Sequence, residues 1–307
     1  MPIGGCATYS FDLRFHCFDS PTMTDTQNLM IPGPAGRLSL RTKGFAAKPS
    51  RVVVLVQGAN MSGQMGYDFS YPGGSGYSMM DAFVQAGFAV VTFSVRGYAL
   101  SELNGEPFGV QTDQAIEDLA AVADWVRAQG WPRPHLLGWS WGGRITGRYC
   151  ETNSDRIGRL VMLDPAIGGG NKILPAPTDE WWHNTHAYFY DRLEKELMDV
   201  AALDALGHRM NDEEPRSPNG IRLENANGSQ AVVPSKVTCP TLMLYGSEAG
   251  KQNYMQGGWD RLKFYEALAT EDKAFVLVPG GGDYAHLQNP RARIFAASIE
   301  FLSVGDA

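Results

Sequence analysis

The stretch Gly138-Trp139-Ser140-Trp141-Gly142-Gly143 decides how this chain is interpreted. It reads G-x-S-x-G with one more glycine, and it lies between an apolar stretch at 135–137 and a helix-like segment at 144–150. A serine between glycines at a strand-to-helix turn projects its hydroxyl out of the backbone, where it can act as a nucleophile. We therefore expect Ser140 to be a nucleophile, with a base, an acid and an oxyanion hole supplied elsewhere.

Strands and helices alternate on both sides of this turn. Apolar runs typical of strands buried on both faces occur at 51–56, 88–93, 159–163, 241–245 and 275–278. Helical periodicity occurs at 78–85, 113–128, 259–269 and 290–302, and two short strands at 28–31 and 37–42 come first. This alternation predicts an α/β fold with a mostly parallel, twisted sheet covered by helices.

The alternation breaks after the sixth predicted strand. Residues 166–236 contain no strong buried strand, but they hold an aromatic cluster, a helix-like run at 191–206 and Asn-Gly pairs at 219–220 and 227–228, which we interpret as turns. We interpret residues 166–236 as a helical cap inserted into a core. The predicted core comprises residues 25–165 and 237–307, and residues 1–24 form an N-terminal extension.

Composition narrows the class of partner. The 307 residues are 44% hydrophobic, enough for a substantial core, and the formal net charge of −7 argues against nucleic acid as a partner. No apolar run reaches the length of about 20 residues that a membrane helix needs. The N-terminal residues lack the basic and apolar regions of a signal peptide, so we expect a cytoplasmic protein that binds no membrane.

The cysteines do not suggest a metal site. Cys6, Cys17, Cys150 and Cys239 form no C-x-x-C pair, so we expect no zinc site. Cys6 and Cys17 could form a disulfide, although a reducing compartment disfavours it. Residues 280–282 are three glycines after a strand, but they lack dinucleotide-binding spacing, and we expect no cofactor.

The predicted base is His286, which follows the last predicted strand in a glycine-rich loop. Such a loop can carry an imidazole over Ser140 to accept its proton. The chain order, serine before histidine, fits this arrangement. Asp283 is too close to His286 in sequence to orient the ring, and His183 and His186 are interpreted as substrate-contacting or surface residues.

Two carboxylates compete for the role of the acid, whose task is to orient the imidazole. Glu248 follows the strand at 241–245, and Asp164 ends the strand at 159–163. The oxyanion hole needs two backbone N–H groups. We assign them to Trp141, which follows the nucleophile, and to Ala59 in the loop after the strand at 51–56, with Asn60 as the second choice.

Together these residues resemble the α/β-hydrolase superfamily over residues 25–304, outside the insertion. Residues 138–142 match its nucleophile elbow, residues 57–60 stand where many members carry His-Gly-x-x, and residues 94–101 resemble its D-x-R-G-x-G-x-S turn. The sequence departs from the family pattern at three places. Gln57 replaces a histidine, Ser94 and Ala99 replace an aspartate and a glycine, and Ala249 stands where the family's acid is expected.

The resemblance implies hydrolysis of a carboxylic ester or lactone through an acyl-serine intermediate, with a small-molecule substrate. The alternatives are an acyltransferase, a C–C bond hydrolase with the same triad, or a non-catalytic ligand-binding member of the fold. Aromatic and apolar side chains favour a moderately bulky apolar substrate, although the aromatic residues of the insertion could equally pack it onto the core. The predicted substrate-binding residues are Asn60, Met61, Trp139, Trp181 and Trp182.

Overall fold

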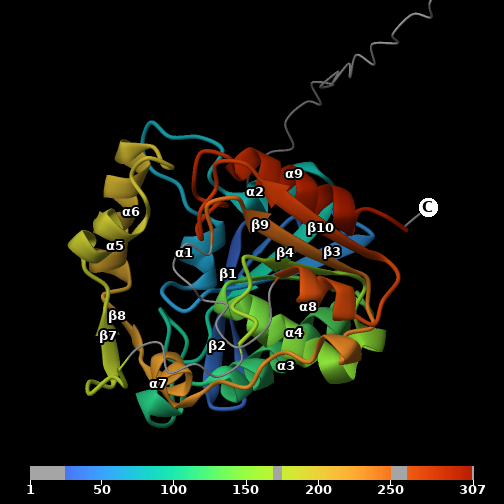
Figure 1. Cartoon of the computed structure of the whole chain (residues 1–307), viewed down its shortest axis with the longest axis horizontal. Coiled ribbons are helices and arrows are strands. Elements are labelled where there is room, and N and C mark those ends of the chain that lie inside the picture. Colours follow the sequence, from blue (N-terminus) through green and yellow to red (C-terminus); the bar gives the residue numbers. More distant parts are fainter. Residues whose placement is uncertain (1–24, 169–174, 250–260, 306–307) are drawn as a thin grey trace, which may run out of the picture.

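The computed structural model describes residues 25–168, 175–249 and 261–305. The predicted N-terminal extension and the Cys6–Cys17 pair lie outside the described residues. An eight-stranded sheet in the order β1-β2-β4-β3-β5-β6-β9-β10 crosses the molecule (Figure 1). Its strands are β1 (Gln27–Gly33), β2 (Gly36–Lys43), β3 (Arg51–Val56), β4 (Phe88–Phe93), β5 (His135–Trp139), β6 (Leu160–Leu163), β9 (Thr241–Gly246) and β10 (Lys273–Val278).

The sheet is parallel from β4 to β10, and β1 and β2 form an antiparallel hairpin that pairs with β4. Helices cover both faces, with α2 and α9 on one and α3, α4 and α8 on the other (Figure 1). The helices are α1 (Gly63–Tyr67), α2 (Met79–Gln85), α3 (Thr112–Ala128), α4 (Trp141–Asn153), α8 (Arg261–Ala267) and α9 (Arg291–Leu302). The predicted α/β class, with a mostly parallel sheet covered by helices, is confirmed.

Strand order explains where a site can form. β4 precedes β5 in the chain, yet the two strands lie on opposite sides of β3. Chain connections therefore leave β3 and β5 in opposite directions, and a crevice opens at their carboxyl ends. The loop after β3 and the turn after β5 both border this crevice, which places Ala59 and Ser140 at the same edge of the sheet.

The segment after β6 contains more structure than the sequence predicted. The expected helix at 191–206 is two helices, α5 (His186–Arg192) and α6 (Val200–Glu213), and an antiparallel pair joins β7 (Trp181–His183) to β8 (Arg216–Pro218). The two Asn-Gly pairs are not hairpin turns, because Asn219 and Gly228 flank the ends of α7 (Gly220–Asn227). Residues 63–67, for which the sequence analysis predicts no helix, form α1.

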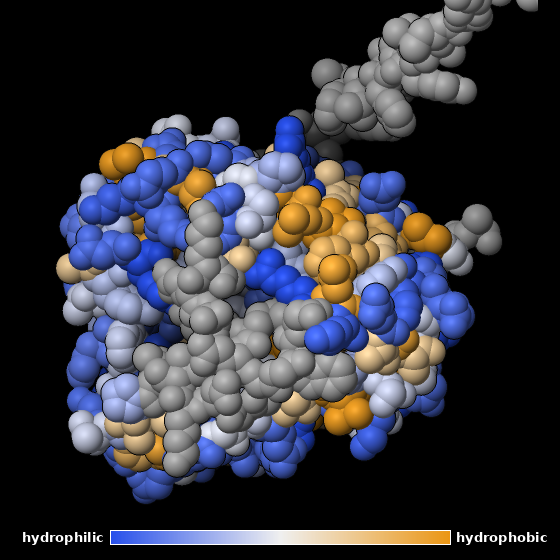
Figure 2. All heavy atoms as spheres, in the orientation of Figure 1, coloured by the Kyte–Doolittle hydropathy of each residue, from blue (hydrophilic) through white to orange (hydrophobic). Residues whose placement is uncertain are grey.

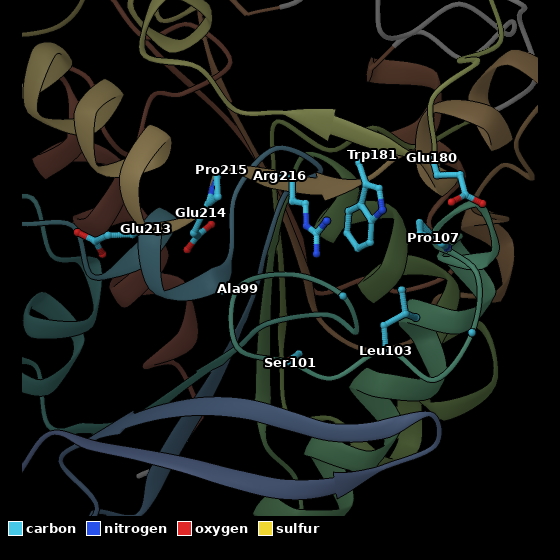
Figure 3. Close-up of a pocket in the computed structure, with 12 residues that line it drawn as sticks. Ala99, Ser101, Leu103, Pro107, Glu180, Trp181, Glu213, Glu214, Pro215 and Arg216 are labelled. Atoms are coloured by element: carbon cyan, nitrogen blue, oxygen red, sulfur yellow. The ribbon is translucent and has the colours of Figure 1, made fainter.

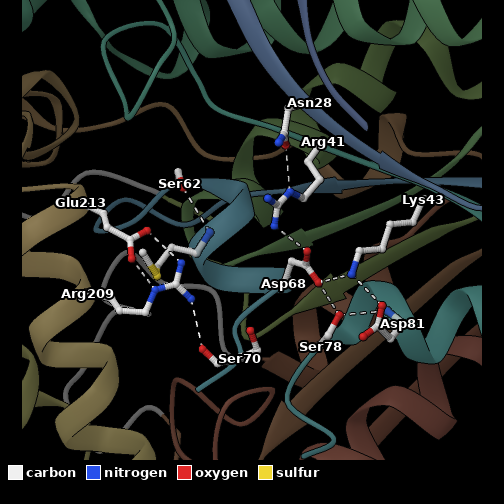
Figure 4. Close-up of polar contacts among 11 residues, drawn as sticks. Asn28, Arg41, Lys43, Ser62, Asp68, Ser70, Ser78, Asp81, Arg209 and Glu213 are labelled. Atoms are coloured by element: carbon white, nitrogen blue, oxygen red, sulfur yellow. Dashed lines mark hydrogen bonds and ion pairs between the residues drawn. The ribbon is translucent and has the colours of Figure 1, made fainter. Parts of the chain in front are cut away.

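Polar contacts attach this segment to the core. The Glu214 carboxylate accepts hydrogen bonds from the Ser62 backbone N–H, at 2.8 Å, and from the Ser62 hydroxyl. Burial raises the pKa of Glu214. Within α6, Arg209 pairs with Glu213 and also donates to the Ser70 carbonyl at 3.2 Å (Figure 4). These contacts hold α6 beside the loop that follows β3.

The surface is mostly polar in Figure 2, and hydrophobic residues gather over β10 and α9. Leu277 on β10 is 51% exposed and Val304 after α9 is 54% exposed. None of the helices in the described ranges combines the length and the apolar character needed to cross a membrane.

Candidate active site

Ser140 occupies a strained turn between β5 and α4. Its backbone has φ 54° and ψ −115°, a region that non-glycine residues rarely adopt. The neighbouring glycines make the turn possible, because a Cβ at Gly138 or at Gly142 would lie 2.1 Å from a backbone oxygen. A Cβ at Gly143 would lie 2.4 Å from the Pro165 ring. The G-x-S-x-G-G pattern is therefore required by close packing of backbone on three sides.

Ser140 lines a pocket of about 420 Å³. The carboxyl ends of β3 and β5 contribute Ala59, Asn60, Trp139 and Trp141, and the loop after β6 contributes Asp164. The loop after β10 contributes Asp283 and Tyr284, and the segment after β6 closes the pocket with Trp182, Tyr188, Arg192 and Arg222.

Not every predicted substrate-binding residue reaches this pocket. Asn60, Trp139 and Trp182 line it. Met61 does not, because it is fully buried in the core on one face of the sheet. Trp181 points into a second cavity of about 580 Å³, between β7–β8 and the 97–107 loop, where the Arg216 guanidinium lies 4.2 Å from its ring centre (Figure 3). Alternation along β7 explains this, since neighbouring strand residues face opposite sides.

The structure does not bring His286 to Ser140, contrary to our expectation. Its side chain is fully buried, with its ring 4.5 Å from that of Trp139. Neither ring nitrogen has a hydrogen-bond partner among the described residues. Burial in this apolar setting lowers the pKa of His286 to about 3, so the ring is neutral at physiological pH. His286 is not among the residues that line the pocket, although Trp139, against which its ring packs, is one of them.

Asp283, which the sequence analysis set aside, is the acidic residue of that loop which lines the pocket. The indole N–H of Trp139 donates to the Asp283 carbonyl at 2.7 Å and fixes the loop against β5. Gly58 leaves room for the same indole, since a Cβ there would lie 2.7 Å from its ring. The loop thus presents Asp283 to the pocket and turns His286 into the core.

Of the two candidate acids, Asp164 lines the pocket with Ser140 and Glu248 does not. One carboxylate oxygen of Asp164 accepts the Gly246 N–H at 3.2 Å. Burial, and secondarily the nearby charge of Asp283, raise the pKa of Asp164 well above its ordinary value. Glu248 accepts a hydrogen bond from the Ser247 hydroxyl at 3.2 Å, outside the pocket.

The two predicted oxyanion-hole residues lie beside the nucleophile. Ala59 and Trp141 both line the pocket. Trp141 is the first residue of α4, where a backbone N–H has no partner within the helix and can donate to a ligand. The Tyr98 hydroxyl donates to the Ala59 carbonyl at 2.9 Å and holds that loop in place.

Four arginines that sequence reasoning missed also line the pocket: Arg144, Arg192, Arg222 and Arg261. Arg222 reaches the oxyanion loop from α7, and its guanidinium donates to the Asn60 side chain at 2.7 Å and to the Asn219 side chain at 3.1 Å. Burial lowers the pKa of Arg222, and none of the described carboxylates forms an ion pair with it. Its ring partner is Trp182, at 4.2 Å.

A serine on a strained strand-to-helix turn, at the carboxyl edge of a helix-covered parallel sheet, defines a class of proteins built around an exposed nucleophile. Comparison with known families agrees, because residues 51–206 match the alpha/beta hydrolase fold family. The chain belongs to that family.

Several curated relatives share one name. The 2-hydroxy-6-oxononadienedioate/2-hydroxy-6-oxononatrienedioate hydrolase of Burkholderia vietnamiensis is 26% identical over 206 residues, which cover 58% of this chain and 68% of that protein. Its counterpart from Paraburkholderia phymatum is 32% identical over 114 residues, covering 36% of this chain and 38% of that protein. Among solved structures, the enol-lactonase of Burkholderia xenovorans LB400 has a TM-score of 0.67 at 15% identity, covering 90% of this chain and all of that one.

Proposed function

We propose that this protein is a hydrolase that attacks a substrate carbonyl carbon with Ser140 and passes through an acyl-serine intermediate. The observation that carries the proposal is the position of Ser140, at a strained turn lining a pocket beside Ala59 and Trp141. Backbone strain is retained at functional sites when the surroundings enforce it. A nucleophile flanked by two candidate N–H donors suits a reaction in which negative charge develops on oxygen.

The groups available to move protons are Asp164 and Asp283, which share the pocket with Ser140. A carboxylate is a weaker base than an imidazole, but two neighbouring carboxyl groups cannot both ionise freely, and the pair retains a proton to higher pH. Such a pair can accept the Ser140 proton and return it. We therefore assign the acid–base role to this carboxyl pair rather than to His286.

The reaction balances with these groups alone. The Ser140 oxygen forms a bond to the carbonyl carbon while its proton passes to the carboxyl pair, and the Trp141 and Ala59 N–H groups face the oxyanion. Collapse breaks the bond to the leaving group, which takes that proton. Water, deprotonated by the same pair, then attacks the acyl-serine, releases the acid product and restores the serine hydroxyl.

The arginines favour a substrate that carries a carboxylate. A buried guanidinium without a carboxylate partner is costly unless a ligand supplies the negative charge. Arg222 meets that description and lies against Asn60, beside the oxyanion loop. The aromatic rings of Trp139, Trp182 and Tyr188 would cover the apolar part of such a substrate.

Two bond types remain as candidates. The predicted ester or lactone is one. A C–C bond is the other. The names of the curated relatives favour it, because they describe hydrolases of oxo-dienedioate acids, whose substrates carry carboxylates. A panel that pairs a carboxylate-bearing ester with a 6-oxo-dienoate of similar size separates the two, since Ser140-dependent turnover of one alone identifies the bond.

Ser140→Ala tests the nucleophile. We expect loss of all turnover and of labelling by a fluorophosphonate probe, with an unchanged circular dichroism spectrum. Ser75→Ala, in an exposed loop, is the matched control. Unchanged labelling of the Ser140 variant would reject the proposal.

The pH profile tests the carboxyl pair. Asp283→Asn should lower kcat by roughly 10²- to 10⁴-fold, the usual contribution of general acid–base catalysis. Asp283→His puts an imidazole into the pocket, and we expect it to move the activity toward neutral pH. Full activity of the Asp283→Asn variant, with an unshifted profile, would show that the pair has no such role.

Arg222→Met tests the substrate class. Losing a hydrogen bond to a charged group costs about 1.5–3 kcal/mol, so kcat/KM for an acidic ester should fall roughly 10- to 150-fold. A neutral ester of the same shape should lose much less. Arg216→Met is the control, because Arg216 lies over Trp181 in the other cavity. Equal losses for the acidic and neutral esters would contradict the assignment.

A further inference from the structure

Three side chains that are scattered in the sequence meet on the outer side of the segment after β6. Asp204 and His208 are one turn apart on α6, so both face the same side of that helix. His186 is the first residue of α5, which lies beside α6 (Figure 1). His186 is half-buried, and Asp204 and His208 are exposed.

The ligand atoms of these residues converge. His186 Nε2 lies 2.9 Å from Asp204 Oδ1, and His208 Nε2 lies 3.9 Å from the same oxygen. The two imidazole rings have centres 4.4 Å apart, and one ligand atom from each of the three residues lies within 4.8 Å of the others. Ligands around a tetrahedral zinc ion, bound at about 2.0–2.1 Å, are separated by roughly 3.3 Å. Small side-chain rotations would reach that spacing.

The helix packing is shaped to permit this arrangement. Gly207 lies inside α6, where glycine costs about 1 kcal/mol relative to alanine. A Cβ at this position would lie 2.7 Å from His186 Cδ2 and 3.2 Å from the His186 carbonyl. Only glycine therefore lets the His186 ring reach the face of α6 that carries Asp204 and His208.

We propose that His186, Asp204 and His208 form a binding site for a divalent transition metal, with Zn²⁺ as the favoured ion. Two imidazoles and one carboxylate are ligands that zinc accepts, and water would complete the coordination. The mixed nitrogen and oxygen set disfavours Mg²⁺ and Ca²⁺, which prefer oxygen ligands. None of these three residues lines the Ser140 pocket.

Bound metal would act on the pocket through α5. Tyr188 and Arg192 on this helix line the Ser140 pocket, and the Asn60 side chain donates to the Tyr188 hydroxyl at 3.2 Å. A metal bridging the start of α5 to α6 would fix the helix that carries both side chains. The site is therefore a structural clamp, and it supplies no group to the reaction.

Calorimetric titration of chelator-treated, untagged protein with ZnCl₂ tests the proposal, with MgCl₂ titrated in parallel. We expect one Zn²⁺ per chain, no heat from Mg²⁺, and a higher melting temperature with Zn²⁺. His186→Ala and His208→Ala should each abolish the tight binding event. His183→Ala is the matched control, because His183 is an exposed histidine of the same segment, paired at 3.5 Å with Asp179.

Gly207→Ala supplies a second test that removes no ligand. We expect it to weaken Zn²⁺ binding at least tenfold, because the added methyl group displaces His186. Absence of a binding event in the unaltered protein would overturn the proposal. So would Zn²⁺ affinity that survives both histidine substitutions.

Discussion

Replacing His286 with leucine separates a core histidine from a catalytic one. The His286 ring is fully buried and its pKa is lowered from 6.5 to about 3 by burial. Between pH 6.5 and about pH 3, His286 therefore binds a proton in the unfolded chain but not in the folded chain. The stability linked to the neutral His286 ring is fully present above pH 6.5 and is lost progressively as the pH falls toward 3.

The size of the effect follows from the shift. About pH 5 is roughly 1.5 units below the pKa of His286 in the unfolded chain, so protonation there lowers the free energy of the unfolded state by about 2 kcal/mol. His286→Leu removes this penalty together with two buried nitrogens that lack partners. Removing such groups without leaving others unpaired is close to neutral at neutral pH. We expect the variant to gain about 2 kcal/mol over the unaltered protein between pH 7.5 and pH 5.

Urea denaturation at the two pH values measures this difference, with His183→Leu as an exposed control. Turnover at neutral pH should survive in His286→Leu, since the ring makes no hydrogen bond to Ser140. A variant that folds normally but loses activity as completely as Ser140→Ala would refute this reasoning. It would mean that the loop after β10 rearranges to deliver His286 during catalysis.

Two further substitutions test what holds the fold in place. Gly142→Ala should destabilise the protein by about 3 kcal/mol or more, measured by thermal melting, because its Cβ would lie 2.1 Å from a backbone oxygen. Gly109→Ala, where a Cβ meets nothing within 4 Å, is its control, and equal melting temperatures would contradict the packing argument. Asp118→Ala should cost about 3–5 kcal/mol in urea denaturation, since it strands the buried Arg96 guanidinium, 2.7 Å from the Asp118 carboxylate. Glu117→Ala removes an exposed partner of the same arginine and should cost at most about 1 kcal/mol, so similar losses would refute the distinction.

The sequence predicted the parts of this molecule that depend on local pattern. Strands β3 and β4 are nearly continuous apolar runs, and the structure buries them on both faces as expected. The turn at Ser140 was also predictable, because its glycines report close backbone packing whatever lies further away. Helix ends in the segment after β6 were not, since the chain between α5 and α6 is tied to a distant loop, where the Asn289 N–H donates to the Leu197 carbonyl at 2.8 Å.

The site was harder to predict because its members come from distant parts of the chain. The choice between Asp283 and His286 depends on which residue the loop after β10 presents to the pocket and which it buries, and sequence spacing carries no such information. Arg222 reaches Asn60 across 162 positions of sequence. The three candidate metal ligands likewise meet only because α5 packs on α6 at Gly207.

Backbone geometry gives a reason to regard Asp164 as part of the site rather than as a strand end. Asp164 has φ 38°, so Ser140 and Asp164 are both non-glycine residues in the left-handed region, and both line the pocket. The chain is tied on either side of Asp164, because Ser140 donates to the Leu163 carbonyl at 3.0 Å and Ala166 donates to the Ser140 carbonyl at 2.8 Å. These backbone bonds do not require a carboxylate at position 164, and a glycine there would adopt the same φ without strain. An aspartate kept here at a conformational cost, beside a serine kept at a similar cost, supports our proposal that the two side chains act together.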